Sequence, residues 1–256
     1  MAHPSAAERP GEVARQLVEP EALANSSEGE PAWPHYRFLT MKLARQLERR
    51  LEDALDGLAG RIFRGGLQVP ELAARLAREA ELAEFKTVAG PATANHFRLL
   101  INPANLDGSE RASTELSEAF AAHAADRGWR LEGPVTVTIG PSTSVGVGSA
   151  TCEATVVPGL LAPWATLTDR NGAIVEIRPN RALIGRSTEA DAVINAPEVS
   201  RLHALIYRQD GAAYVIDLSS ANGTRIDGVA VKRSPVRLSD GSDLALADLA
   251  FRFQMS

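Results

Sequence analysis

The stretch Asp217–Thr224, which reads Asp-Leu-Ser-Ser-Ala-Asn-Gly-Thr, decides the fold class of the C-terminal part of this chain. Its Asn-Gly pair predicts a tight turn between two strands. Other turn dipeptides separate short runs rich in valine and isoleucine; they are Asn171-Gly172, Asp210-Gly211, Asp227-Gly228 and Asp240-Gly241. Short apolar runs divided by turns in this way are typical of a sandwich or barrel built only from strands.

Two further motifs precede this turn, Gly185-Arg186 and Ser200-Arg201-Leu202-His203. Each of the three motifs is common by itself. Together, in this order and within a strand-rich segment, they resemble an FHA (forkhead-associated) domain over roughly Ala162 to Met255. The resemblance implies an all-β FHA sandwich of about eleven strands. It also implies that loops at one end of the sandwich read phosphothreonine.

The side chains in these motifs suit a phosphate ester, which carries about −1.5 to −2 charges near neutral pH and three strong acceptor oxygens. Arg186 supplies a planar fork of charged donors, and Arg201 adds a second charge. Ser200 offers a hydroxyl donor, while the amide of Asn222 can grip the main chain of an extended peptide. We therefore expect Arg186, Ser200, Arg201 and Asn222 to bind the phosphopeptide.

The resemblance assigns supporting roles to other residues of the motifs. Gly185 and Gly223 serve backbone geometry, and His203 braces the binding loops by hydrogen bonding, with Thr224 in the same supporting group. The chain departs from the family at Ala221, where threonine, serine or a longer polar residue is common. Alanine cannot donate a side-chain hydrogen bond, so we expect a reduced affinity rather than a lost site.

Simpler interpretations of these residues stay open at this point. Arg186 could be a surface arginine that pairs with Glu189 or Asp191, and Ser200 could be an ordinary turn residue. Ser200 with His203 could also be imagined as a nucleophile and its base. The sequence shows no carboxylate to orient that histidine and no nucleophile elbow, so we do not expect an enzyme.

The residues before the boundary formed by Pro158-Gly159 and Pro163 have a different character. From Met41, leucines at spacings of three or four predict an amphipathic helix that ends at Gly65-Gly66. A second helix begins near Pro70, and Ser113 could cap a third that closes at Gly128. Three strands complete the set; they are predicted at Phe97 to Ile101, Pro134 to Ile139 and Ala150 to Val157. This mixture indicates a small α+β domain.

This α+β region also resembles a known family. The run Leu47–Glu52, then Arg61–Gly66 and Pro70–Glu79, is similar to the start of FhaA-type bacterial proteins, in which an α+β domain precedes an FHA domain. The sequence thus predicts four segments: a disordered extension at 1–40, the FhaA-like domain at 41–157, a short linker at 158–163 and the FHA domain at 164–256. Because that linker is short, free movement between the two domains is in doubt.

The amino-acid composition limits the classes of partner that this chain is expected to bind. The net charge of −5 does not favour coating nucleic acid or an anionic membrane. The single cysteine, Cys152, cannot form an internal disulfide, and no Cys/His cluster predicts a metal or cofactor. No apolar run has the length of a membrane span or a signal-peptide core, so we expect a cytoplasmic protein without an integral membrane segment.

The leading hypothesis is a phosphothreonine-binding adaptor. The resemblance implies a role in Ser/Thr protein kinase signalling, with a phosphorylated kinase, pseudokinase or envelope-synthesis protein as the candidate partner. The alternative is a scaffold whose FHA fold binds partners independently of phosphorylation, and Ala221 favours that alternative.

Overall fold

The computed structural model describes residues 67–106 and 109–256. All of them lie within one compact unit, Ala44–Ser256. The extension predicted at 1–40 and the helix predicted from Met41 lie outside the described residues. The described part has one hydrophobic core shared by helices and strands and a second formed by strands. The expected fold class, an α+β domain followed by a β-sandwich, is confirmed.

The α+β domain comprises two helices, one 3-10 turn and five strands among its described residues. In chain order these are α2 (Val69–Leu82), β1 (Phe85–Thr87), β2 (Gly90–Ala92), β3 (His96–Ile101), η3 (Pro103–Asn105), α3 (Ser109–Asp126), β4 (Thr136–Pro141) and β5 (Ala150–Thr155).

Helix α2 follows the predicted pattern. Proline is tolerated in its first turn because the amide hydrogens there have no partner within the helix. The Glu71 carboxylate accepts a hydrogen bond from the Gln68 amide at 3.2 Å, which satisfies one further donor. Leu72, Leu76 and Ala80 are buried on one face. The period of three to four residues therefore predicted both the helix and the side that packs.

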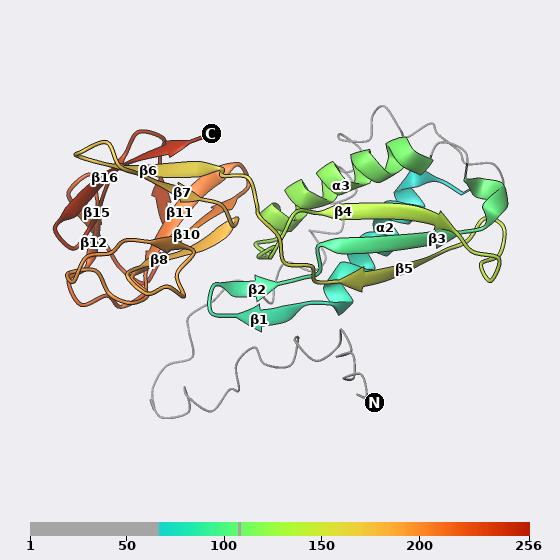
Figure 1. Ribbon diagram of the computed structural model, residues 1–256, viewed down its shortest axis with the longest axis horizontal. Helices are drawn as coiled ribbons and strands as arrows, with labels where there is room; N and C mark the ends of the chain where they lie inside the picture. Colours follow the sequence, from blue (N-terminus) through green and yellow to red (C-terminus); the bar gives the residue numbers. More distant parts are fainter. Residues whose placement is uncertain (1–66, 107–108) are drawn as a thin grey trace, which may run out of the picture. The chain divides into compact units, whose positions relative to one another are not determined.

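A three-stranded sheet in the order β4-β3-β5 supports the helices (Figure 1). Strand β3 runs parallel to β4 and antiparallel to β5. Phe97, Leu99 and Ile101 alternate along β3 and are buried in the core that both helices share. The ring of Phe97 meets that of Phe120 from α3 edge to face, with centroids 4.7 Å apart. Both helices therefore cover the same face of the sheet.

Two details of this domain differ from the sequence prediction. Helix α3 begins at Ser109, so Ser113 lies inside it, where its carbonyl accepts the Ser117 hydroxyl at 2.7 Å. The hairpin β1–β2 was not predicted at all. Its strands are three residues long and pair Phe85 with Ala92 and Thr87 with Gly90, which is too short for alternation to be visible in the sequence.

The second domain consists of eleven strands in two sheets. They are β6 (Ala165–Asp169), β7 (Ile174–Ile177), β8 (Arg181–Gly185), β9 (Ala192–Val193), β10 (Ala204–Gln209), β11 (Ala212–Asp217), β12 (Thr224–Ile226), β13 (Val229–Val231), β14 (Val236–Leu238), β15 (Asp243–Leu246) and β16 (Leu249–Met255). The sheet orders are β14-β11-β10-β8-β9 and β13-β12-β15-β16-β6-β7. Their inner side chains share one core, in which Trp164 packs edge to face on Phe253.

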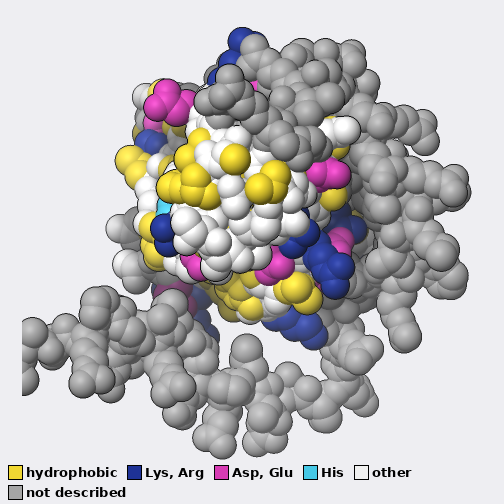
Figure 2. Space-filling model, turned by 90° about the vertical axis from the view of Figure 1, so that its right-hand side faces the viewer, with side chains coloured by type: hydrophobic (Ala, Val, Ile, Leu, Met, Phe, Trp, Pro, Cys, Tyr) yellow, Lys and Arg dark blue, Asp and Glu magenta, His cyan; other side chains and the backbone are white. Residues whose placement is uncertain are grey.

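The described surface carries both signs of charge. On the face shown in Figure 2, acidic and basic side chains are interspersed among hydrophobic ones. Within residues 67–106 and 109–256, no helix combines the length and the apolarity that crossing a membrane requires.

Candidate functional site

The segment that follows β8 lies against the Ser200-Arg201 segment through main-chain hydrogen bonds. The Arg186 amide donates to the Ser200 carbonyl at 3.0 Å, and the Ser187 amide donates to the Arg201 carbonyl at 3.1 Å. The side chains of Arg186 and Arg201 are exposed. Two of the predicted phosphate-binding segments, far apart in the sequence, are therefore adjacent in the fold.

Gly185 permits this close approach. A Cβ atom at Gly185 would lie 2.0 Å from the Arg201 carbonyl oxygen, well inside any real contact distance. The requirement is one of space, because Gly185 is not among the glycines with a positive φ. Glycine is thus the only residue that lets the two segments lie this close without a shift in the backbone.

Arg186 forms no ion pair with any residue that the structure describes. The pairing with Asp191 that the sequence left open is not formed, because both Asp191 carboxylate oxygens accept hydrogen bonds from Arg130 at 2.7 Å. Glu189 likewise has no ion pair among the described residues. The guanidinium of Arg186 is therefore exposed with its donors available.

The buried ring of His203 connects the Ser200 segment with the turn that contains Gly223. The ring is fully buried; Nδ1 accepts from the Ser200 amide and Nε2 donates to the Gly223 carbonyl, each at 3.1 Å. Burial lowers the pKa of His203, against the opposite effect of the Gly223 hydrogen bond. A neutral ring with its hydrogen on Nε2 satisfies both contacts, so His203 takes the bracing position that the resemblance implies.

Asp217 organises the turn Asp217–Thr224, a role that the sequence analysis did not assign. Its carboxylate accepts from the Ser220 amide at 3.0 Å, the Ser220 hydroxyl at 2.6 Å and the Thr224 hydroxyl at 2.7 Å. The Gly223 amide then donates to the Ser220 hydroxyl oxygen at 3.0 Å. An aspartate followed three residues later by a serine is a turn signal that could have identified Asp217 and Ser220.

Ser200 contacts this turn and Asn222 belongs to it, and each keeps one polar group available. The Ser200 hydroxyl oxygen accepts from the Ala221 amide at 3.0 Å, which leaves its hydrogen to donate. The Asn222 side-chain nitrogen donates to the Glu198 carbonyl at 2.9 Å, while its oxygen has no partner among the described residues. The Ala221 side chain is exposed, and only its amide takes part.

We refer to Arg186, Ser200, Arg201 and Asn222 as the loop cluster. Its elements join through the main chain and through His203, so a stiff scaffold presents two positive charges, a hydroxyl donor and an amide oxygen. This combination suits a phosphate ester attached to an extended peptide.

The same geometry does not form a nucleophile and base. The Ser200 contact to the His203 ring comes from the main-chain amide, whereas the Ser200 hydroxyl faces the Ala221 amide. Both ring nitrogens of His203 are already engaged. Among the described residues, no group of His, Cys, Asp and Glu side chains is arranged to hold a metal ion.

Comparison with known families identifies two parts of the chain. Residues 182–247 match the FHA domain, and residues 44–153 match the family described as the FhaA N-terminal domain. These matches cover the loop cluster and most of the α+β domain respectively.

Curated relatives share only a part of their length with this chain. The transcriptional regulatory protein EmbR of Mycobacterium tuberculosis is 42% identical over 74 residues, which are 28% of this chain and 19% of EmbR. The proliferation marker protein Ki-67 of Mus musculus is 34% identical over 84 residues, 33% of this chain and 3% of Ki-67.

Solved structures show the same partial correspondence. Mycobacterium tuberculosis EmbR in complex with a low-affinity phosphopeptide has 33% identity and a TM-score of 0.34, covering 37% of this chain and 25% of that one. The FhaA FHA domain complexed with the intracellular domain of Rv3910 has 27% identity and a TM-score of 0.32, covering 36% of this chain and 100% of that one.

Proposed function

We propose that this chain, which contains an FhaA N-terminal domain followed by an FHA domain, is an adaptor that binds phosphothreonine-containing partners. The observation that carries the proposal is the loop cluster, in which the exposed Arg186, Arg201 and Asn222 and the half-buried Ser200 stand on a backbone braced by His203. Arg186 and Arg201 supply charge for the phosphate, and the Ser200 hydroxyl supplies a neutral donor. Binding rather than turnover is the activity for which the cluster is arranged.

Asn222 provides the second part of the recognition. Because its nitrogen is held by the Glu198 carbonyl, its oxygen is oriented and can accept a main-chain amide from the peptide. A contact to the peptide backbone holds any sequence, so it adds affinity without selecting neighbouring residues. Selection would come from the loops around the cluster.

The family resemblance is also the basis for a proposed biological setting. We place the chain in Ser/Thr protein kinase signalling in the cytoplasm, with a phosphorylated kinase, pseudokinase or envelope-synthesis protein as partner. The working domain limits are 41–157 for the FhaA N-terminal domain, 158–163 for the linker and 164–256 for the FHA domain.

A phosphothreonine peptide library tests the proposal. The full chain is titrated with a pool of nine-residue peptides that have phosphothreonine at the centre and degenerate flanking positions, and with the same pool unphosphorylated. We expect binding of the phosphorylated pool alone. Equal binding of both pools, or none of either, would reject the proposal.

A phosphate-independent scaffold is the second candidate, and Ala221 is the observation that favours it. The exposed alanine side chain adds no donor where the family commonly has a polar one. In that case the unphosphorylated pool would bind as well as the phosphorylated pool, and replacement of Arg186 would change neither affinity.

A further inference from the structure

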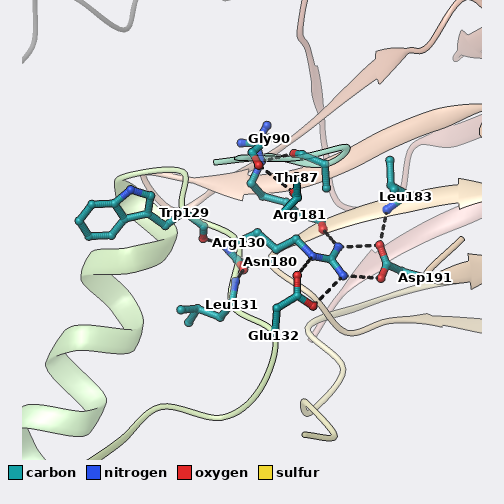
Figure 3. A network of polar contacts seen from close by, with 11 residues as sticks. Thr87, Gly90, Trp129, Arg130, Leu131, Glu132, Asn180, Arg181, Leu183 and Asp191 are labelled. Carbon is teal, nitrogen blue, oxygen red and sulfur yellow. Dashed lines mark hydrogen bonds and ion pairs between the residues drawn. The ribbon is translucent and has the colours of Figure 1, made fainter. Parts of the chain in front are cut away.

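The FHA domain is joined to the FhaA N-terminal domain by a buried ion pair. Arg130 follows α3, and its two terminal nitrogens donate to the Asp191 carboxylate at 2.7 Å each (Figure 3). It also donates to the Arg181 carbonyl at 2.7 Å and to Glu132 at 2.7 Å. Only 12% of the Arg130 side chain and 15% of the Asp191 side chain are exposed. Paired charges that are this well shielded hold a fixed geometry.

Asp191 also closes the segment that carries Arg186. Its carboxylate accepts from the Leu183 amide at 2.7 Å, and its own amide donates to the Leu183 carbonyl at 2.9 Å. Just beyond it, Ala192 and Val193 of β9 pair in parallel with Ile184 and Gly185 of β8. The segment from Arg186 to Asp191 is therefore a loop whose two ends are held together by β8 and β9, and Arg130 binds the carboxylate of Asp191 at its second end.

Other contacts reinforce this junction. Asn180 accepts from the Leu131 amide at 3.1 Å and donates to the Trp129 carbonyl, so it pairs with the main chain on both sides of Arg130. Ala89, from the turn between β1 and β2, packs in a cluster that covers the outer side of β8, β10 and β11; its other buried members are Leu183, Leu205, Tyr207 and Ile216. Polar and apolar contacts thus both connect the two domains.

The electrostatics at Arg130 favour its pairing with the two carboxylates. Burial alone lowers the pKa of Arg130, but its hydrogen bonds to Asp191 and Glu132 outweigh burial and raise that pKa. The two carboxylates therefore compensate the charge of the buried guanidinium. Separation of the domains would expose the Asp191 carboxylate and leave only the Leu183 main chain to hold that end of the loop.

We propose that Arg130 of the N-terminal domain is a positioning residue for phosphopeptide binding, acting through Asp191 on the loop that presents Arg186. The inference rests on the proposed function of the loop cluster. The N-terminal domain then contributes to peptide binding, because its contact with Asp191 and the binding of the peptide stabilise the same conformation of the loop from Arg186 to Asp191. Such coupling is reciprocal by thermodynamic necessity.

The test compares Arg130→Gln in the full chain with a matched control, Arg98→Gln. Arg98 belongs to the same domain, but its ion pair with Glu153 spans 3.8 Å and is about 60% exposed. Titration with the degenerate phosphothreonine peptide pool should show an affinity at least about five-fold weaker for Arg130→Gln, the lower end of common coupling strengths. The Arg98→Gln control should bind like the unmodified chain.

A milder variant guards against simple misfolding. Asp191→Asn keeps an oxygen that can accept from the Leu183 amide, but it removes the charge that Arg130 holds. It should weaken binding in the same direction, and the double variant should be no weaker than the poorer single variant, because both substitutions break one interaction. Additive losses would overturn the proposal.

Amide hydrogen exchange provides a readout that a merely structural residue would not alter. The Leu131 amide, which donates to Asn180 across the junction, should exchange several-fold more slowly when the phosphopeptide pool saturates the unmodified chain. Arg186→Ala, at the same peptide concentration, should show no such slowing. Unchanged Leu131 exchange on peptide binding, or unchanged affinity in Arg130→Gln, overturns the positioning role while leaving the proposed function standing. Failure of the unmodified chain to prefer the phosphorylated pool overturns both.

Discussion

Two arginines near the ends of strand β8, Arg181 and Arg186, have opposite environments. At the start of the strand Arg181 is buried; its Nε donates to the Ala89 carbonyl at 2.6 Å, and its guanidinium lies 4.7 Å from the centre of the Tyr207 ring. Burial lowers the pKa of Arg181. Just past the end of the strand, Arg186 is exposed and has no ion pair among the described residues.

This contrast distinguishes an arginine that serves the fold from one whose guanidinium is left exposed. Arg181 uses its stem, charge and donors to hold the two domains together. Arg186 has a fixed backbone, because its amide bonds to Ser200, and a free head group. A main chain that is already fixed, carrying an exposed charged side chain with no ion-pair partner, favours binding of an anion. The reason is that binding then costs little further conformational entropy.

The largest expected effect comes from the glycine beside Arg186. Gly185→Ala would push a methyl group into the Arg201 carbonyl, so the two halves of the loop cluster must separate. We expect destabilisation of about 1–3 kcal/mol or more and loss of measurable phosphopeptide binding. Denaturant unfolding and calorimetric titration measure the two effects.

Gly140→Ala in β4 is the control for Gly185→Ala. The nearest atom to a Cβ there is a Leu100 methyl group at 4.0 Å, an ordinary contact. This variant should bind phosphopeptide normally. A Gly185→Ala protein that retained full affinity would show that close approach of the segments is not needed.

Replacing Arg181 or Arg186 with alanine, one at a time, separates their two roles. Arg186→Ala should lose about 1.5–3 kcal/mol of phosphopeptide affinity, the usual value of a charge-assisted hydrogen bond, with little change in melting temperature. Arg181→Ala should lower the melting temperature. The Ala89 carbonyl loses its hydrogen-bond donor, and the guanidinium that lies over the Tyr207 ring is removed. Calorimetry measures both quantities, and a large loss of stability in Arg186→Ala would contradict the division of roles.

The third expectation concerns pH and His203. Because the folded-state pKa lies below its ordinary value of 6.5, the unfolded chain binds more protons in the range just below pH 6.5. This contribution to stability is complete above pH 6.5 and declines as the pH falls from there toward the folded-state pKa. Protonation would also turn Nδ1 into a donor facing the Ser200 amide.

Melting temperatures at pH 7 and pH 5.5 test this linkage. The unmodified chain should lose more stability between the two values than His203→Gln, whose amide can accept from one loop and donate to the other without titrating. Equal losses in both proteins would mean that His203 does not contribute. Peptide affinity should fall over the same range, since the second phosphate pKa is about 6.

The smallest expected effect is a gain at position 221. Ala221 lies beside Asn222 with its side chain exposed, and its amide already contacts the Ser200 hydroxyl. Ala221→Thr adds a hydroxyl donor next to the site where Arg186 would hold the phosphate. We expect affinity for the phosphothreonine pool to rise several-fold, less than the full 1.5–3 kcal/mol of such a bond because a side chain must be ordered.

The double variant Ala221→Thr with Arg186→Ala decides whether that gain depends on the anion. Without Arg186 the phosphate is no longer held, so the added hydroxyl should have no effect. Identical affinities of the unmodified chain and Ala221→Thr would show that this position faces away from the ligand.

Local patterns in the sequence determined much of this protein. Turn dipeptides predicted an all-β second domain, and the resemblance carried by three ordered motifs implied its eleven strands and named the residues of the loop cluster. The spacing of Leu72, Leu76 and Ala80 predicted helix α2. These features depend on periodicity and backbone preference within a few residues, which any reader of the chain can see. The Asp217 network belongs to this class too, although only its Asn-Gly turn was recognised.

The tertiary structure alone decided which charges pair. Arg130 and Asp191 lie 61 positions apart, and no local pattern links them; Asp191 stood equally well as a partner for Arg186. The unpredicted β1–β2 hairpin places Ala89 against the sheet and so buries Arg181, while Arg186 stays in solvent. The physical reason is that an ion pair depends on distance and burial, which arise only when segments remote in the chain pack together.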